Sequence, residues 1–181
     1  DDGVSFIVPV KNGMAPLPRT IASIEAQRDR AQSEILVIDD SSTDGSLEWL
    51  NACATEGRLR VLSGRGRGLS AAINLGVQAT RYSVICQIDQ DVELLPGWVD
   101  RLTGELRRDP CLGAVQGHYM RSAEARLFAR VMSLDLEQRY VATCNGRTDH
   151  VCTGNTAFRK QALVDAGLFD ESIGYGGDND M

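Results

Sequence analysis

The amino-acid sequence predicts an α/β fold with a doubly wound, mostly parallel Rossmann-like sheet and helices on both faces. Two observations support this prediction. Between residues 4 and 88, short apolar runs rich in β-branched residues alternate with segments of helical periodicity, which is typical of right-handed strand–helix–strand units. Polar residues also follow directly after the expected strands, at the end of the sheet where open α/β folds bind their ligands.

The expected strands and helices alternate along the first half of the chain. The run 4–10 is apolar at successive positions, as in a strand buried on both faces, and Pro9 should mark the point where strand pairing stops. The elements expected up to residue 88 are strands at 4–10, 34–38, 59–62 and 83–88 and helices at 17–28, 45–54 and 70–79.

The second half of the chain begins with an expected helix over 96–108, where Pro96 suits the first turn. A strand is expected over 111–119, an extended segment over 151–158, a helix over 160–166 and a glycine-rich acidic loop over 174–181. The segment 123–141 carries apolar residues at helical spacing among arginines and acids, which predicts an amphipathic helix. Its apolar face either packs on the core or contacts a partner or a membrane surface.

The composition is that of one globular domain, and we expect residues 1–181 to fold as a single unit. The chain is 43% hydrophobic and 24% charged. Its net charge of −6 argues against a nucleic-acid partner, because a surface that neutralises many phosphates is basic. No apolar run approaches the roughly 18 residues of a membrane span.

The five cysteines show no spacing typical of a metal site. They form no Cys-x-x-Cys pair, their number is odd, and Cys86 lies within an apolar run. We interpret them mainly as reduced, buried thiols, which indicates a cytoplasmic protein, and only Cys144 and Cys152 are close enough in the sequence to suggest a disulfide. If the segment 123–141 contacts lipid, that protein lies at the inner face of the membrane.

Two carboxylates, those of Asp89 and Asp91, follow directly after the buried strand 83–88. An Asp-x-Asp string is common by chance, and its place at a strand end is what makes it a candidate metal site. Carboxylate oxygens suit Mg²⁺ or Mn²⁺, which can neutralise a diphosphate leaving group. We expect Asp91 to be the direct ligand. The alternative is a solvated loop with a turn-forming aspartate.

A second pair of carboxylates, Asp39 and Asp40, closes the strand 34–38. A carboxylate at this place can accept hydrogen bonds from a base imide or from ribose hydroxyls. The alternative role is a helix cap, which Asp44 or Ser42 can supply without help. The sequence therefore favours Asp40 for nucleoside binding.

Two glycine-rich loops are further candidates for the site. The loop 64–70 leads into a helix, and its arginines can face phosphate oxygens, although a surface turn is an equal alternative. In the loop 174–181, Asp178 is the candidate base that takes the proton from an acceptor hydroxyl during an inverting transfer. The alternative is an acidic tail without a catalytic role.

Taken in order, these motifs resemble those of the family-two glycosyltransferases, which have the GT-A fold. The similarity extends over almost the whole chain. It runs through residues 6–12, 37–46, 68–76, 89–91, 153–160, 167–171 and 176–181. Several motifs in the right order are far more specific than any one of them.

The resemblance implies an inverting, metal-dependent transfer of a sugar from a nucleotide-diphospho-sugar, with a UDP-sugar favoured, to a hydroxyl of a sugar, polysaccharide or lipid-linked acceptor. It implies Mn²⁺ or Mg²⁺ held by Asp91 and Asp89, and it makes Asp178 the catalytic base. The donor-binding residues that it implies are Pro9, Val10, Asn12, Asp39, Asp40, Gly68, Asn74, Asp89, Gly154 and Asn155.

Three features depart from the family pattern. Ile73 stands where many members have arginine, so that a donor-phosphate contact is either missing or supplied by Arg65 or Arg67, and Gly177 replaces the usual glutamate. The chain also stops at Met181, where family members continue into a helix, and we expect a domain truncated at its C-terminal end. The alternative hypothesis is therefore a nucleotide-sugar-binding domain without turnover.

Overall fold

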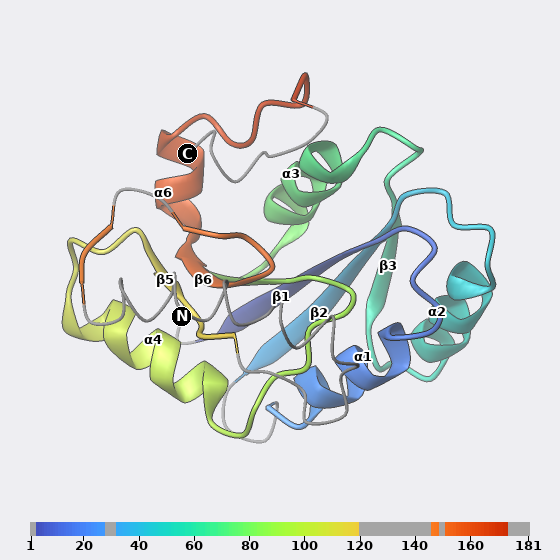
Figure 1. Ribbon diagram of the computed structural model, residues 1–181, viewed down its shortest axis with the longest axis horizontal. Coiled ribbons are helices and arrows are strands. Elements are labelled where there is room, and N and C mark those ends of the chain that lie inside the picture. Colours follow the sequence, from blue (N-terminus) through green and yellow to red (C-terminus); the bar gives the residue numbers. More distant parts are fainter. Residues whose placement is uncertain (1–2, 28–31, 120–145, 149–150, 174–181) are drawn as a thin grey trace, which may run out of the picture.

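Six strands form one sheet in the computed structural model, which describes residues 3–27, 32–119, 146–148 and 151–173 (Figure 1). The strands are β1 (Val4–Val10), β2 (Ser33–Asp39), β3 (Arg60–Ser63), β4 (Val84–Ile88), β5 (Ala114–Gln116) and β6 (Asn155–Arg159). Their order in the sheet is β3-β2-β1-β4-β6-β5. The first four strands are parallel, and β6 pairs antiparallel with both β4 and β5. The mostly parallel sheet predicted from the sequence is confirmed.

Helices cover both faces of the sheet (Figure 1). The helices are α1 (Leu17–Glu25), α2 (Ser46–Thr55), α3 (Leu69–Ala79), α4 (Trp98–Arg108) and α6 (Lys160–Asp165). Phe6 of β1 belongs to the core cluster that includes residues of α1, α2 and α4, whereas its neighbour Ile7 belongs to the cluster with α3 and α6. Because successive side chains of a strand point to opposite faces, the run 4–10 is apolar throughout.

The order of the strands reverses between β1 and β4. The chain steps from β1 to β2 and β3 on one side, and then returns to place β4 on the other side of β1. In doubly wound sheets, ligands bind outside the carboxyl ends of the strands at this kind of switch point. The carboxyl ends of β1, β2 and β4 are therefore the place to look for a site.

Pro9 marks the end of pairing on only one side of β1, so the expectation that pairing stops there is half right. The ladder with β4 ends at Ile7, but the ladder with β2 continues to Val10. Val4 N–H donates to Gln32 O and Val10 O accepts from Asp40 N–H, so the even-numbered residues of β1 bond towards β2. Pro9, which has no N–H, faces the side where the ladder has already ended.

Several expected boundaries were wrong by a few residues. The helix expected over 17–28 ends at Glu25, and α4 begins at Trp98 after Gly97, whose φ of 79° lies in the left-handed region, so Pro96 precedes the first turn. The strand expected over 111–119 shrinks to Ala114–Gln116, because a turn at Asp109 binds the amides of the two residues before Gly113. The helix expected over 123–141 lies outside the described residues.

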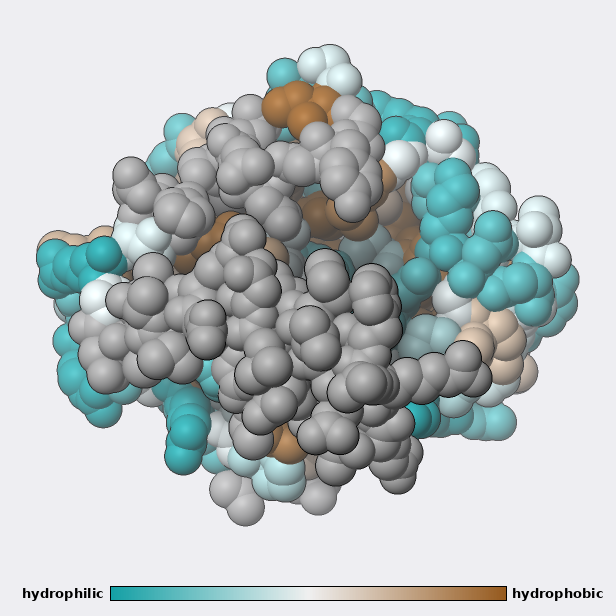
Figure 2. Space-filling view, in the orientation of Figure 1, coloured by the Kyte–Doolittle hydropathy of each residue, from teal (hydrophilic) through white to brown (hydrophobic). Residues whose placement is uncertain are grey.

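The surface in the orientation of Figure 1 is hydrophilic on the side where α2 and β3 lie (Figure 2). In the part of the chain that the structure describes, no helix is both long and apolar enough to cross a membrane.

Cys53 and Cys86 are buried as expected, and burial raises the pKa of both thiols. Cys111, in contrast, is exposed.

Two glycines test the packing of helices on the sheet. A Cβ added to Gly76 of α3 would lie 2.7 Å from Ile7 Cγ2 and 3.0 Å from Ile38 Cδ1, whereas nothing lies within 4 Å of a Cβ on Gly104 of α4. We expect Gly76→Ala to lower the free energy of unfolding by about 1–3 kcal/mol. Gly104→Ala should raise it by about 0.5–1 kcal/mol, because alanine favours a helix. Urea denaturation measures both, and equal effects would contradict the packing described.

Candidate active site

Polar residues at the carboxyl ends of β1, β2 and β4 lie in direct contact. The backbone N–H of Lys11, which follows β1, donates to Gln90 Oε1 beyond β4 at 2.9 Å. The Lys11 ammonium lies 3.4 Å from Asp40 Oδ2 at the end of β2. Lys11 therefore joins the three strand ends at the switch point of the sheet.

Asp39 and Asp40 are buried, and each uses only one side-chain oxygen among the described residues. Asp39 Oδ2 accepts from Ser42 N–H at 3.1 Å, and Asp40 Oδ2 accepts from Gly68 N–H at 3.1 Å. The Oδ1 atoms of both carboxylates are buried and have no hydrogen-bond donor in the part of the chain described. A buried carboxylate oxygen without a donor is costly, so both residues retain capacity to bind a ligand.

The amino ends of the strands show how a buried carboxylate is satisfied when its role is structural. Glu34, at the amino end of β2, accepts hydrogen bonds on Oε1 from Ser5 Oγ at 2.8 Å and Arg81 N–H at 2.6 Å. Its Oε2 pairs with Arg60 Nη1 at 3.0 Å. Both oxygens are used there, in contrast to the carboxylates at the end of β2.

The loops after β1 and β2 are tied together by side chains. Asn12 Oδ1 accepts from Thr43 N–H at 2.8 Å, and Asp44 Oδ2 accepts from Met14 N–H at 2.9 Å. Asp44 Oδ1 also accepts from the backbone and hydroxyl of Ser46 at the start of α2. These hydrogen bonds, that of the Ser46 hydroxyl first, lower the pKa of Asp44. Asp44 thus accepts hydrogen bonds from the first residue of α2, and it is one of the two residues, with Ser42, that were expected to cap this helix.

Asp89 is oriented by Gln87 of its own strand, β4, and by Gly154, which directly precedes β6. Gln87 Nε2 donates to Asp89 Oδ1 at 3.0 Å, and Asp89 N–H donates to Gly154 O at 2.9 Å. Gly154 N–H in turn donates to Gln87 Oε1. A Cβ on Gly154, whose φ is 88°, would lie 2.2 Å from Asp89 Oδ2. Only glycine suits this position, because of both the backbone conformation and the close carboxylate.

Asp91 is exposed, and no group among the described residues bonds its carboxylate. The described part of the chain brings no three His, Cys, Asp or Glu side chains together as a metal site. Asp89 and Asp91 still fit a hard cation of the magnesium type, because such ions are commonly bound through one or two carboxylates and complete their shell with phosphate oxygens and water.

Asn74 and Asn155, both expected to bind the donor, use their side chains inside the protein. Asn74 Nδ2 donates to Phe169 O at 2.8 Å, and its Oδ1 accepts from Phe169 N–H at 3.0 Å. Asn155 Oδ1 accepts from Trp98 Nε1 at 2.7 Å, with both side chains buried. Glu171 bonds Asn74 as well and forms an ion pair with Arg67. Donor contacts by these residues remain predictions.

The remaining expected residues fall into two groups. Pro9 and Val10 are buried in β1, and Gly68 supplies its N–H to Asp40. Asp178, the expected base, lies outside the described residues. Sequence reasoning missed Gln87 and the role of Gln90. The signal for Gln87 was a single amide within an otherwise apolar buried strand, which requires hydrogen-bond partners.

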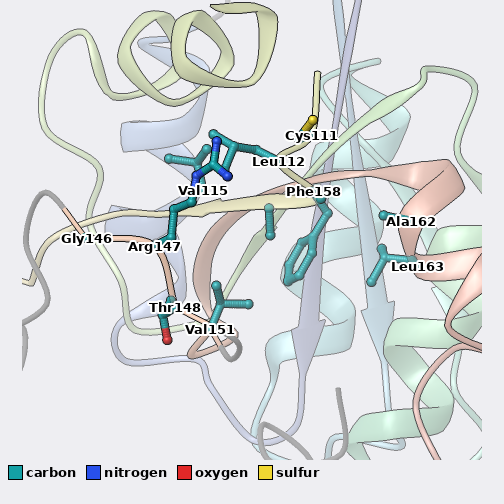
Figure 3. A pocket seen from close by; sticks show the side chains of 12 residues that line it. Cys111, Leu112, Val115, Gly146, Arg147, Thr148, Val151, Phe158, Ala162 and Leu163 are labelled. Atoms are coloured by element: carbon teal, nitrogen blue, oxygen red, sulfur yellow. The ribbon is translucent and has the colours of Figure 1, made fainter. Parts of the chain in front are cut away.

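A separate pocket of about 420 Å³ lies at the β5 edge of the sheet (Figure 3). Phe158 and Leu163 form part of its largely apolar wall, Arg147 also lines it, and none of its described lining residues is acidic. Phe158 pairs with Ile85, whereas Asn155 pairs with Ile88 at the carboxyl end of β4. The pocket thus lies towards the other end of the strands, and it lacks the carboxylates of a diphosphate–metal site.

The order of motifs around the switch point agrees with a known family. Residues 5–167 match the sequence profile of glycosyl transferase family 2. The chain belongs to this family. Among the described residues, the acids of two of its motifs, Asp39–Asp40 and Asp89–Asp91, lie at the carboxyl ends of the parallel strands.

Curated proteins that are named as sugar transferases align over much of the chain. Over 104 residues it is 35% identical to an undecaprenyl-phosphate 4-deoxy-4-formamido-L-arabinose transferase of Aeromonas hydrophila, covering 55% of the chain and 32% of that protein. Over 185 residues it is 29% identical to a pre-mycofactocin glycosyltransferase of Mycobacterium tuberculosis, covering 98% of the chain and 38% of the relative. The chain spans less than half the length of these relatives.

Solved structures of glycosyltransferases share the fold. A mannosyltransferase from Pyrobaculum calidifontis in complex with GDP-Man and Mn²⁺ superposes with a TM-score of 0.74 at 22% identity, covering 98% of this chain and 49% of that one. TarS of S. aureus in complex with UDP-GlcNAc gives 0.68 at 17% identity, covering 97% and 50%. At these identities the likeness establishes the fold, which is the GT-A fold that the motifs predicted.

The hydrogen bond between Asn155 and Trp98 should contribute to the stability of this family-2 domain. Asn155→Ala leaves the buried indole N–H without its acceptor, and we expect the free energy of unfolding to fall by about 2 kcal/mol. Asn51→Ala, at an exposed position of α2, is the matched control and should change it by less than about 0.5 kcal/mol. Urea denaturation measures both. Equal effects of the two variants would contradict a supporting role for Asn155.

Proposed function

We propose that the chain is the catalytic core of an inverting, metal-dependent glycosyltransferase that moves a sugar from a nucleotide-diphospho-sugar to an acceptor hydroxyl. The observation that carries the proposal is the placement of Asp40 after β2 and of Asp89 and Asp91 after β4, on either side of the end of β1, in a family-2 domain. A UDP-sugar is the proposed donor. Nucleotide-sugars occur in the complexes of two structural neighbours, as GDP-Man and as UDP-GlcNAc.

The nucleoside binds at the end of β2 in this proposal. Asp40 holds the loop after β3 with one oxygen, through Gly68 N–H, and its other oxygen has no donor among the described residues. An imide N–H of the base or a ribose hydroxyl can supply that donor, since an ionised carboxylate only accepts hydrogen bonds. The Lys11 ammonium beside Asp40 adds a positive charge on the same side.

The diphosphate binds beside the carboxylates that follow β4. Asp91 and Asp89 would hold Mn²⁺ or Mg²⁺, with phosphate oxygens as further ligands. The cation, when bound, neutralises the charge that develops on the leaving diphosphate. Asp89 is held in place for this role by Gln87 and Gly154, whereas Asp91 is exposed and has no partner among the described residues.

The chemical step that we propose uses Asp178 as the base. Its carboxylate takes the proton of the acceptor hydroxyl, the acceptor oxygen attacks the anomeric carbon, and the bond from that carbon to the diphosphate breaks with inversion. The acceptor that we propose is a sugar, a polysaccharide or a lipid-linked molecule. A lipid-linked acceptor would place the protein in the cytoplasm at the inner face of a membrane, and one curated relative carries undecaprenyl-phosphate in its name.

Thermal unfolding in the presence of UDP-, GDP- and TDP-sugars, each with and without Mn²⁺, tests the donor and the metal together. We expect a UDP-sugar with Mn²⁺ to stabilise the parent chain by about 2.7 kcal/mol at a donor concentration of 100 Kd. Asp91→Ala should remove the part of this stabilisation that depends on Mn²⁺. Asp40→Asn should weaken binding with or without Mn²⁺, because it changes the nucleoside contact.

The matched control is Asp165→Ala, which removes an exposed carboxylate at the end of α6. It should leave donor stabilisation unchanged. If a donor with Mn²⁺ stabilised Asp91→Ala as well as the parent chain, the metal assignment would be wrong. Donor binding without transfer by a full-length protein that contains this domain would instead favour a binding domain without turnover.

A further inference from the structure

We propose that Gln90, between the two carboxylates that follow β4, is a positioning residue for the nucleoside side of the site. Its side chain holds the backbone of Lys11 by two hydrogen bonds. Lys11 N–H donates to Gln90 Oε1 at 2.9 Å, and Gln90 Nε2 donates to Lys11 O at 3.4 Å. The inference rests on the proposed donor site and adds to it a residue that need not touch the donor.

The Gln90 amide replaces strand pairing that the sheet lacks at this point. The ladder between β1 and β4 ends at the pair of Ile7 with Gln87, and Pro9 has no N–H to extend it. A primary amide carries one donor group and one acceptor, as a peptide group does. Its bonds to both backbone groups of Lys11 therefore continue the contact between β1 and β4 beyond the end of the ladder.

The frame that presents this amide is itself fixed. Gln90 O accepts from the hydroxyl of Thr20, a wholly buried residue of α1, at 2.9 Å. The preceding residue, Asp89, donates its N–H to Gly154 O at 2.9 Å. The backbone that carries the Gln90 side chain is thus held by hydrogen bonds at two neighbouring residues. The side chain can therefore hold Lys11 in a defined position.

Gly13 provides the space for the Gln90 side chain. A Cβ added to Gly13 would lie 2.3 Å from Gln90 Oε1 and 2.7 Å from its Cδ. Gly13 is not among the residues with positive φ, so alanine is compatible with its backbone. Any side chain at position 13 would therefore displace the Gln90 amide without straining the loop itself.

The consequence reaches the nucleoside carboxylate through Lys11. The Lys11 ammonium lies 3.4 Å from Asp40 Oδ2, and the ammonium stem begins at the backbone that Gln90 holds. If that backbone is released, the Lys11 ammonium shifts away from its position beside Asp40. Nucleotide affinity should therefore depend on Gln90 and on Gly13, although neither of them contacts Asp40 in the described contacts.

A double-mutant cycle on the whole chain tests the proposal, with UDP and MnCl₂ as the probe in calorimetry. We expect Gln90→Ala to weaken UDP binding by about tenfold, because two hydrogen bonds that hold the site are lost. Gly13→Ala should weaken it by a similar factor. The double variant should bind like Gln90→Ala alone, because no amide is left to displace, so the two effects should not add.

A second readout does not depend on nucleotide binding. Hydrogen exchange of the Lys11 amide should be slow in the parent chain and faster in Gln90→Ala and in Gly13→Ala, at unchanged melting temperature. Gln78→Ala, at an exposed position of α3, is the control and should change neither exchange nor affinity.

Four results would overturn the proposal. UDP affinity equal to that of the parent in Gln90→Ala would show that Gln90 does not position the site, and fully additive effects in the double variant would show that Gly13 does not act through the Gln90 amide. Unchanged Lys11 exchange in Gln90→Ala would show that the hydrogen bond does not form in solution. Absence of UDP binding to the parent chain would instead overturn the proposed function, and the role of Gln90 with it.

Discussion

The ladder between β1 and β4 ends at Ile7, two residues before Pro9, and the site depends on how the gap beyond it is held. Backbone groups that leave a ladder need other partners. In this chain, amide side chains supply them: Gln90 bonds the backbone of Lys11, and Gln87 accepts from Gly154 N–H. The acidic residues that follow β4 lie on a backbone that these side-chain hydrogen bonds hold. The placement of their carboxylates therefore depends on the contacts that replace strand pairing where the ladder ends.

In the part of the chain described, buried carboxylates have all their hydrogen-bond donors at the amino ends of the strands but not at the carboxyl ends. This difference indicates that a ligand binds at the carboxyl ends. Glu34 at the amino edge has both oxygens satisfied within the protein. Asp39 and Asp40 at the carboxyl edge each have one oxygen without a donor among the described residues. An unsatisfied buried polar group calls for an explanation, and a bound ligand or ion or a catalytic role is one. The family-2 membership gives this edge its proposed occupant, a nucleotide-sugar.

The sequence could predict the sheet and the strand-end acids because both depend on local pattern. The run 4–10 is apolar on both faces, and parallel strands bring their carboxyl ends to one edge. It could not predict that β6 runs antiparallel, because a short extended segment carries no signal of its direction in the sheet. Nor could it predict that Asn155 holds Trp98, because the partners are 57 positions apart in the chain. The donor contact that the family resemblance implies at Asn155 stays a prediction, whereas the fold uses its side-chain oxygen to accept from Trp98 Nε1.

The measurement that tests the account most directly is a crystal structure of the domain with UDP and Mn²⁺, using the anomalous signal of manganese to locate the ion. The account predicts an anomalous peak at coordination distance from the Asp91 carboxylate, and a base or ribose donor hydrogen-bonded to Asp40. Nucleotide bound at the apolar pocket beside Phe158, or manganese remote from Asp89 and Asp91, would contradict it.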